Sequence, residues 1–231
     1  MMDRHLGRLK KRSDMKRALV IFFLLGSTIA HSDEGGYEYT YLELTVNHSE
    51  EVGYSGVLSA NVPSLPFYIK ASIAEEDVKS QGDQYKKSIE ALSFGVHASI
   101  TDILNGVSKS GLSFSFDAFL DVYAEIGVNR WEIEDLASNT EEGNDAYLRA
   151  GIKMGDPTAW EYDLYVEKTK LAELVIDPAT NNSKYSLSSE TNNNIGIRIT
   201  THLGKNLATS FGYNNDDFSG STLSLGAKLS F

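Results

Sequence analysis

The chain has no cysteine, only four prolines among its 231 residues, and fewer basic than acidic residues. Without thiols, neither a disulfide nor a thiolate metal site can form. The formal net charge is −11 at pH 7. Nucleic-acid binding is therefore disfavoured, because no basic patch exists to replace the counterions of phosphate groups.

The sequence also lacks any helical repeat of apolar residues, so crossover helices and a parallel sheet are not expected. Its most apolar stretch, residues 18–30, is shorter than the roughly 20 residues that a membrane-spanning helix needs. What the chain does have is 19 glycines, 12 tyrosines and 10 phenylalanines. That composition suits strands joined by tight turns.

The amino-terminal region predicts export. Six basic residues between Arg8 and Arg17 precede an apolar core, which ends in small residues and then in a polar segment. This order matches a signal peptide over residues 1–32, cleaved after Ala30 or Ser32, with the alternative of an uncleaved anchor. Either Met1 or Met15 can be the true start. Residues 37–231 are then expected to form one domain.

Alternation of apolar and polar residues predicts ten strands. The last, Leu223 to Phe231, places its leucines and Phe231 on one face and its serines and Lys228 on the other. Nine similar segments precede it, at residues 39–47, 55–62, 67–74, 90–100, 115–130, 146–154, 160–169, 194–203 and 207–213.

The connections between these segments alternate in length, as in an up-and-down barrel. Those at 63–66, 155–158 and 204–206 are short, with glycine and proline turn chemistry in places. Three others are long and polar, at residues 75–88, 132–145 and 171–191. The connection at 101–113 is long where a short one is expected, which leaves eight strands as the alternative.

A strand that alternates and closes on Phe231, together with an export signal, resembles the carboxy-terminal strand of Gram-negative outer-membrane β-barrel proteins. Residues 67–69 and 120–127 look like recurrent strand segments of that group. The resemblance implies an all-β fold: one antiparallel up-and-down transmembrane β-barrel in the cell outer membrane. It also implies a monomer that contacts outer-membrane lipid, lipopolysaccharide and, during biogenesis, the barrel assembly machinery. The expected assembly signal consists of Leu225, Ala227, Leu229 and Phe231.

Two orientations of the faces are possible from alternation alone. A membrane barrel turns its apolar face outward to lipid, whereas a soluble periplasmic, lipocalin-like ligand-binding barrel turns it inward. The apolar faces consist mainly of Ala, Leu, Ile and Val, which favours lipid. Aromatic residues near strand ends suit interfacial girdles, namely Tyr37, Tyr39, Phe67, Trp131, Trp160, Tyr162 and Phe231. Ile197 and Leu120 are expected to face lipid, and Gly196 and Ser210 to be tolerant lumen positions.

The polar face predicts a ladder of ion pairs in the lumen. Asp121 with Lys153 and Glu125 with Arg149 have the same index sum, so one hairpin register would bring both pairs together. An unpaired charge in a narrow lumen is costly, which favours pairing. Further members of the ladder are Asp163, Glu167, Arg198 and Lys228. The expected function is a structural or interaction barrel, or a narrow pore, with the lumen largely closed by these pairs.

Catalysis is not expected, and no cofactor or metal site is indicated. The alternative is an outer-membrane hydrolase of the lipid A deacylase or protease type, which would need His with Ser or Asp at the outer rim. Only His48 lies near that rim, and Ser49 beside it would point to the opposite face on a strand. His97 and His202 fall near the periplasmic ends, and the polar turn at 214–217 lacks the spacing of a calcium loop.

Overall fold

The computed structural model describes residues 37, 39–49, 51–80, 83–101, 119–135, 140–177, 182–217 and 220–231. The predicted signal peptide and the unusual connection after residue 101 lie outside this range. Among the described residues, no helix is long and apolar enough to cross a membrane.

The described residues form ten strands. Their bounds are β1 Tyr41–His48, β2 Val52–Asn61, β3 Phe67–Ser80, β4 Asp83–Ser99, β5 Phe119–Asp135, β6 Thr140–Gly155, β7 Trp160–Asp177, β8 Asn182–His202, β9 Leu207–Asp216 and β10 Gly220–Ser230.

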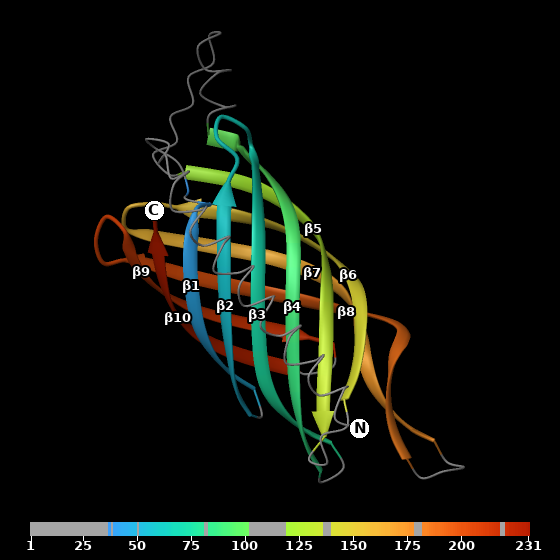
Figure 1. Cartoon of the computed structure of the whole chain (residues 1–231). Helices are drawn as coiled ribbons and strands as arrows, with labels where there is room; N and C mark the ends of the chain where they lie inside the picture. The colour runs from blue at the N-terminus through green and yellow to red at the C-terminus, as the bar shows by residue number, and fades with distance from the viewer. Residues whose placement is uncertain are drawn as a thin grey trace, which may run out of the picture.

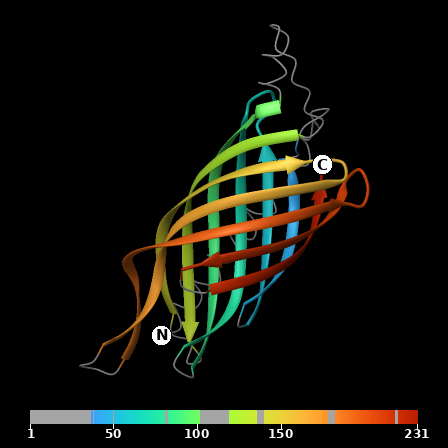
Figure 2. The same ribbon diagram turned by 180° about the vertical axis from the view of Figure 1, so that it is seen from behind.

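These strands make a closed antiparallel barrel (Figures 1 and 2). Each strand pairs with its neighbours in the sequence, and β1 pairs with β10, with Leu44 opposite Ala227. The predicted up-and-down barrel of ten strands is confirmed, and the alternative of eight is wrong. Closure leaves no unpaired sheet edge, which is the condition for a sheet to exist in hydrocarbon.

The turns at residues 62–66, 156–159 and 203–206 lie at the end of the barrel where β10 terminates (Figure 1). In the turn after β6, Gly155 has a φ of 115°, a conformation that favours glycine. Asp156 follows, and its side chain accepts hydrogen bonds from the hydroxyl and the backbone N–H of Thr158 at 2.6 and 2.8 Å. These two bonds lower the pKa of Asp156 from its ordinary value.

The long polar connections predicted at 75–88, 132–145 and 171–191 are wrong, because most of their residues extend the strands. The ladder between β3 and β4 continues to Ser80 opposite Asp83, and that between β7 and β8 to Asp177 opposite Asn182. Apolar alternation ends where the hydrocarbon ends, but backbone pairing does not need apolar side chains. The sequence pattern therefore marks the membrane band rather than the full length of the strands.

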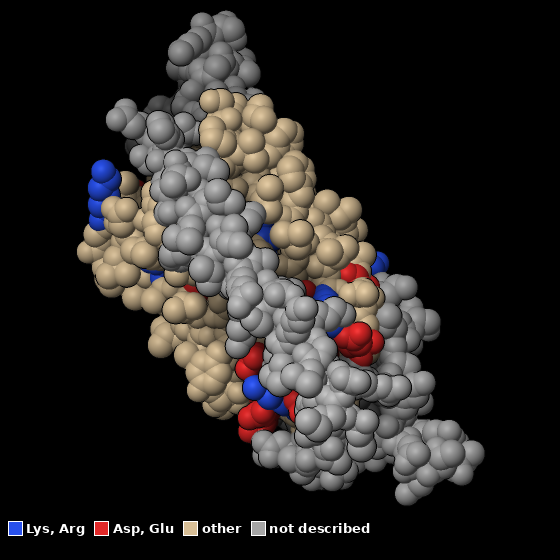
Figure 3. Space-filling model, in the orientation of Figure 1, with Lys and Arg blue, Asp and Glu red and all other residues tan. Residues whose placement is uncertain are grey.

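The apolar face points outward. Along β5, Ile126 is 60% exposed, whereas Glu125, one position earlier, is 6% exposed and faces the lumen. The same alternation holds on the other strands, where most exposed large side chains are apolar. Figure 3 shows a mainly uncharged described surface, with charges gathered toward the end away from the carboxy terminus. The soluble barrel with an apolar interior is therefore wrong.

The predicted aromatic girdle needs correction. Trp160 and Tyr162 are exposed on the outside, as expected, but Trp131 points inward and is buried with Tyr85 and Ile133. Tyr37 and Tyr39 are also buried inside the barrel. Both residues precede β1. Outside a strand the alternation of faces does not apply, so the sequence pattern did not show on which side these two rings lie.

Aromatic rings on the inner wall cover glycines directly opposite them on the adjacent strand. A Cβ added at any of these glycines would overlap the ring, so each pair requires glycine. The pairs are Tyr68–Gly95, Tyr123–Gly151, Tyr147–Gly127, Trp131–Gly143 and Tyr165–Gly196. Gly196 and Ser210 do face the lumen, as expected, but a Cβ at Gly196 meets the ring of Tyr165, and Ser210 donates a hydrogen bond to buried Glu43 at 2.6 Å. The low cost expected for small polar residues at these two positions stays a prediction.

We expect Gly151→Ala to destabilise the barrel by about 1–3 kcal/mol, the usual cost of overpacking. The added methyl group would displace the ring of Tyr123, whose hydroxyl donates to Asp163 at 2.7 Å. Urea unfolding titrations in lipid vesicles measure the effect. Gly204→Ala is the matched control, because an added Cβ there meets no atom within 4 Å. Equal midpoints for the two variants would refute the packing role of this glycine.

Candidate functional site

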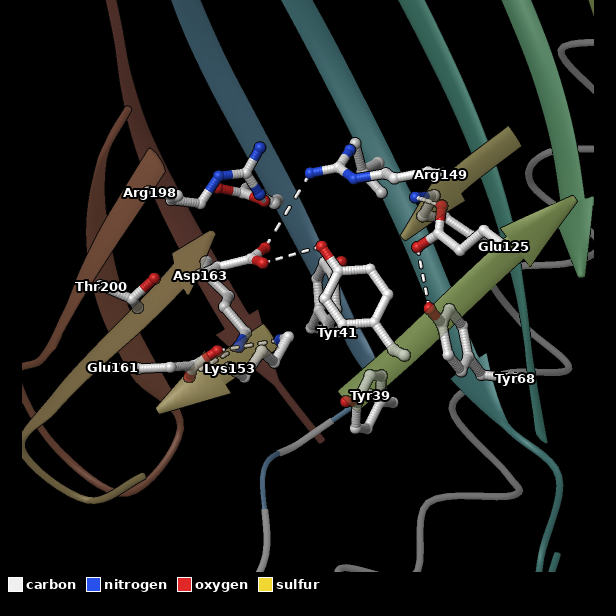
Figure 4. Close-up of a pocket in the computed structure, with 15 residues that line it drawn as sticks. Tyr39, Tyr41, Tyr68, Glu125, Arg149, Lys153, Glu161, Asp163, Arg198 and Thr200 are labelled. Carbon is white, nitrogen blue, oxygen red and sulfur yellow. Dashed lines mark hydrogen bonds and ion pairs between the residues drawn. The ribbon is translucent and has the colours of Figure 1, made fainter. Parts of the chain in front are cut away.

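Charged side chains from several strands meet inside the barrel, around a small cavity (Figure 4). They reach the lumen because they occupy alternate positions of their strands, which all point to the same face. Lys153 and Arg149 of β6, for example, are four residues apart, and Glu161 and Asp163 of β7 are two apart. Burial of so many charges requires that each carboxylate find a cation or hydrogen-bond donors.

Glu125 is the most fully satisfied carboxylate of the cluster. It forms an ion pair with Lys70 of β3 and accepts hydrogen bonds from the hydroxyls of Tyr68 and Tyr147 at 2.9 and 3.2 Å. Lys70 and Tyr68 lie two strands away from β5, so these contacts pass over β4 and join strands that are not adjacent.

Glu161 is shared by three cationic or potentially cationic groups. Lys153 donates to it at 2.9 Å, while Lys228 lies 3.7 Å and His202 3.5 Å from its other oxygen. The ammonium of Lys153 also lies 4.8 Å from the centre of the Tyr39 ring. This group connects β6, β7, β8 and β10 near the end of the barrel where β10 terminates.

A third group joins β8 and β9 to β1. Arg198 of β8 donates to Glu43 of β1 at 2.8 Å, and Ser210 donates to the other oxygen of that carboxylate at 2.6 Å. Beside it, Asp163 accepts a hydrogen bond from Tyr123 and lies 3.9 Å from Arg149.

Tyr37 and Tyr39, which precede β1, help to close the barrel at the end where β10 terminates. The ring of Tyr39 stacks on Tyr68 and His97, with centroids 4.7 and 4.1 Å apart. The hydroxyl of Tyr37 donates to the carbonyl of Phe119 at 2.8 Å, on β5. Both side chains therefore extend from the beginning of β1 across the barrel to strands β3–β5.

The predicted ladder can now be located residue by residue. The register places Asp121 opposite Lys153, Glu125 opposite Arg149 and Asp163 opposite Arg198. Side-chain contacts follow a different pattern. Glu125 pairs with Lys70, Arg198 with Glu43, and Asp121 lies 3.8 Å from His97.

Other members of the ladder also lie close to oppositely charged groups. Arg149 lies 3.6 Å from Glu167, and Lys228 lies 3.7 Å from Glu161. The contributions of Glu43, Lys70 and the tyrosines were missed. An index sum finds only partners on adjacent strands, so their inward position was the one signal available.

The space left between these side chains is small. The cavity measures about 50 Å³, which is room for roughly three or four water molecules. Among the described side chains, no group of three or more His, Asp or Glu is placed to hold a metal ion. His48 ends β1 on the exposed outer side, and Ser49 follows it outside the strand.

The expected assembly residues lie on the outside of the last strand. Leu225, Ala227 and Leu229 are exposed, and the N–H of Phe231 donates to the carbonyl of Thr40 at 3.3 Å. Recognition of this strand by the assembly machinery stays a prediction.

Comparisons with known proteins give structural likenesses only. No family model matches the chain, and no curated protein is significantly similar in sequence. The solved structures that it resembles are outer-membrane β-barrels. LpxR from Salmonella typhimurium has a TM-score of 0.45 and 10% identity, over 83% of this chain and 100% of that one. The KdgM porin scores 0.42 with 7% identity, over 83% and 99% of the two chains. The amino-terminal barrel domain of Pseudomonas aeruginosa OprF scores 0.42 with 12% identity, over 85% and 99%.

Proposed function

We propose that the protein is an integral outer-membrane barrel with a structural or interaction role, whose lumen is closed to solutes by its ion-pair network. The observation that carries this proposal is the cavity of about 50 Å³ between the charged groups, which is too small for a hydrated solute. Contacts such as Lys70 with Glu125 and Arg198 with Glu43 join strands that are not adjacent and occupy space in the lumen. A barrel of about ten strands has little interior beyond what its own side chains occupy.

The exterior supports a location in the outer membrane, reached through the predicted signal peptide. Beyond the apolar band, outward positions carry charge, including Lys86 with Glu75 at 2.9 Å and Arg130 with Glu142. Apolar side chains at one depth and charged ones at the next suit acyl chains and the headgroups of lipid or lipopolysaccharide.

An enzymatic role receives less support from the geometry. The charged cluster lies in the lumen toward the end where β10 terminates, and its histidines, His97 and His202, contact Asp121 and Glu161. We therefore propose a barrel without catalytic activity.

The proposal predicts that wild-type protein conducts little in planar bilayers and that Arg149→Ala with Lys153→Ala raises the conductance. The two changes remove buried cations that fill the lumen, and they leave carboxylates without partners, so stability should fall as well. Single-channel recording measures the first effect and urea titration the second. Arg130→Ala is the control, since Arg130 pairs with Glu142 outside the lumen. Porin-like conductance of the wild type, unchanged in the double variant, would overturn the proposal.

A further inference from the structure

Arg149 is a guanidinium without a hydrogen bond to any described residue. Its nearest carboxylate oxygens, on Glu167 and Asp163, lie at 3.6 and 3.9 Å, and its Nε is buried without a partner. A guanidinium has five N–H donors, and leaving such donors unsatisfied inside a protein is costly. The acceptor that would satisfy Arg149 is missing from its surroundings as described.

The position of Arg149 is nevertheless well defined. Its guanidinium lies 3.6 Å from the centre of the Tyr165 ring, a stacked arrangement that holds the plane of the group. Glu125, opposite Arg149 in the register, is engaged by Lys70, Tyr68 and Tyr147 instead. Asp163 is engaged by Tyr123. Glu125 and Asp163 thus have other donors.

Arg149 lines the cavity together with other groups that favour an acceptor. The wall carries five cationic and four carboxylate side chains, namely Lys70, Arg149, Lys153, Arg198 and Lys228 with Glu43, Glu125, Glu161 and Asp163. The hydroxyl of Tyr39, which is 2% exposed, also lines the cavity and has no hydrogen-bond partner in the described part of the chain. Figure 4 shows the guanidiniums of Arg149 and Arg198 on the same side of Asp163, and they come from β6 and β8, the two strands that flank β7.

We infer that this cavity binds one halide-sized anion, such as chloride, beside the guanidinium of Arg149. A small anion supplies the missing acceptor. A volume of about 50 Å³ suits a single-atom ion better than a six-carbon carboxylate such as gluconate. The inference goes beyond the proposed function, because an anion can occupy the site whether or not the lumen conducts.

The test compares urea unfolding of the full chain in vesicles with sodium bromide or sodium gluconate at equal ionic strength. A ligand that binds only the folded state raises the ratio of folded to unfolded protein by 1 + [L]/Kd, about elevenfold at ten times Kd. We expect bromide to raise the unfolding midpoint of the wild type relative to gluconate. The difference should disappear in Arg149→Gln and persist in Arg130→Gln, which makes the same change outside the lumen.

Crystals of the wild-type protein grown in bromide give a second measurement that does not depend on the stability of a variant. Anomalous scattering should place a bromide ion in the cavity beside Arg149. Absence of that peak, or an equal bromide effect in Arg149→Gln and wild type, would show that only water fills the site and would overturn the inference. Conductance enters neither measurement, so failure of the proposed function would not be mistaken for failure of this site.

Discussion

Glu125→Gln is expected to cost about 3–5 kcal/mol of folding free energy, the range for removing one partner of a buried ion pair. The change keeps the size of the side chain and an acceptor oxygen for one of Tyr68 and Tyr147, which donate to different oxygens of Glu125, but it leaves Lys70 as an uncompensated buried charge. Both members of the pair are about nine-tenths buried or more, with side-chain exposures of 10% and 5%. Urea titrations in lipid vesicles measure the loss.

A second change decides whether the charge of Lys70 is the cause. Lys70→Met in the Glu125→Gln background removes that charge with little loss of volume, and it should recover most of the lost stability, because an apolar replacement of a buried pair is often neutral. An exposed acid offers a matched control. Glu142 pairs with Arg130 and is 58% exposed at its side chain, so Glu142→Gln should cost at most about 1 kcal/mol. If the double variant is no more stable than Glu125→Gln, the ion pair is not the source of the effect.

Alternation was sufficient to predict the strands and which residues share a face of each strand, because every strand contacts lipid on one side and the lumen on the other. Val122, Ile126 and Val128 are all exposed on β5, as a period of two requires. The same pattern did not predict where strands end. Beyond the hydrocarbon no side-chain period is imposed, yet β7 and β8 remain paired as far as Asp177 and Asn182.

Within the charged cluster, only the pairs on adjacent strands could be predicted from the sequence. A constant index sum correctly places Asp121 opposite Lys153 in the register, since a hairpin links the two strands. Contacts between strands that are not adjacent depend on barrel diameter, strand tilt and stagger, and a local sequence pattern does not encode these quantities. Glu43 with Arg198, separated by 155 positions in the chain, is such a contact. Tyr37 and Tyr39 were assigned to the membrane interface for a related reason: their position depends on how the segment before β1 folds into the barrel.

Ile126→Arg is expected to cost about 2–4 kcal/mol, the range for a cationic residue at the midplane of the bilayer on a lipid-facing strand. Ile126 is 60% exposed on the outside of β5, and its register partners on both sides, Phe94 and Leu148, are exposed and apolar as well. It is therefore a sharper probe of the lipid face than Leu120 or Ile197, which are less exposed.

The matched control lies on the same face of the same strand. Glu132→Arg introduces the same side chain six residues further along, where Ser88 and Glu142 are the register partners and the surface is charged. Glu132→Arg should cost about 0–1 kcal/mol, as for positions near the interface. It also replaces one of two acidic residues, Glu132 and Glu142, that lie opposite each other in the register. Folding titrations in vesicles compare the two variants. If arginine costs as little at position 126 as at position 132, the apolar band does not lie in hydrocarbon, and the membrane orientation of the barrel would have to be abandoned.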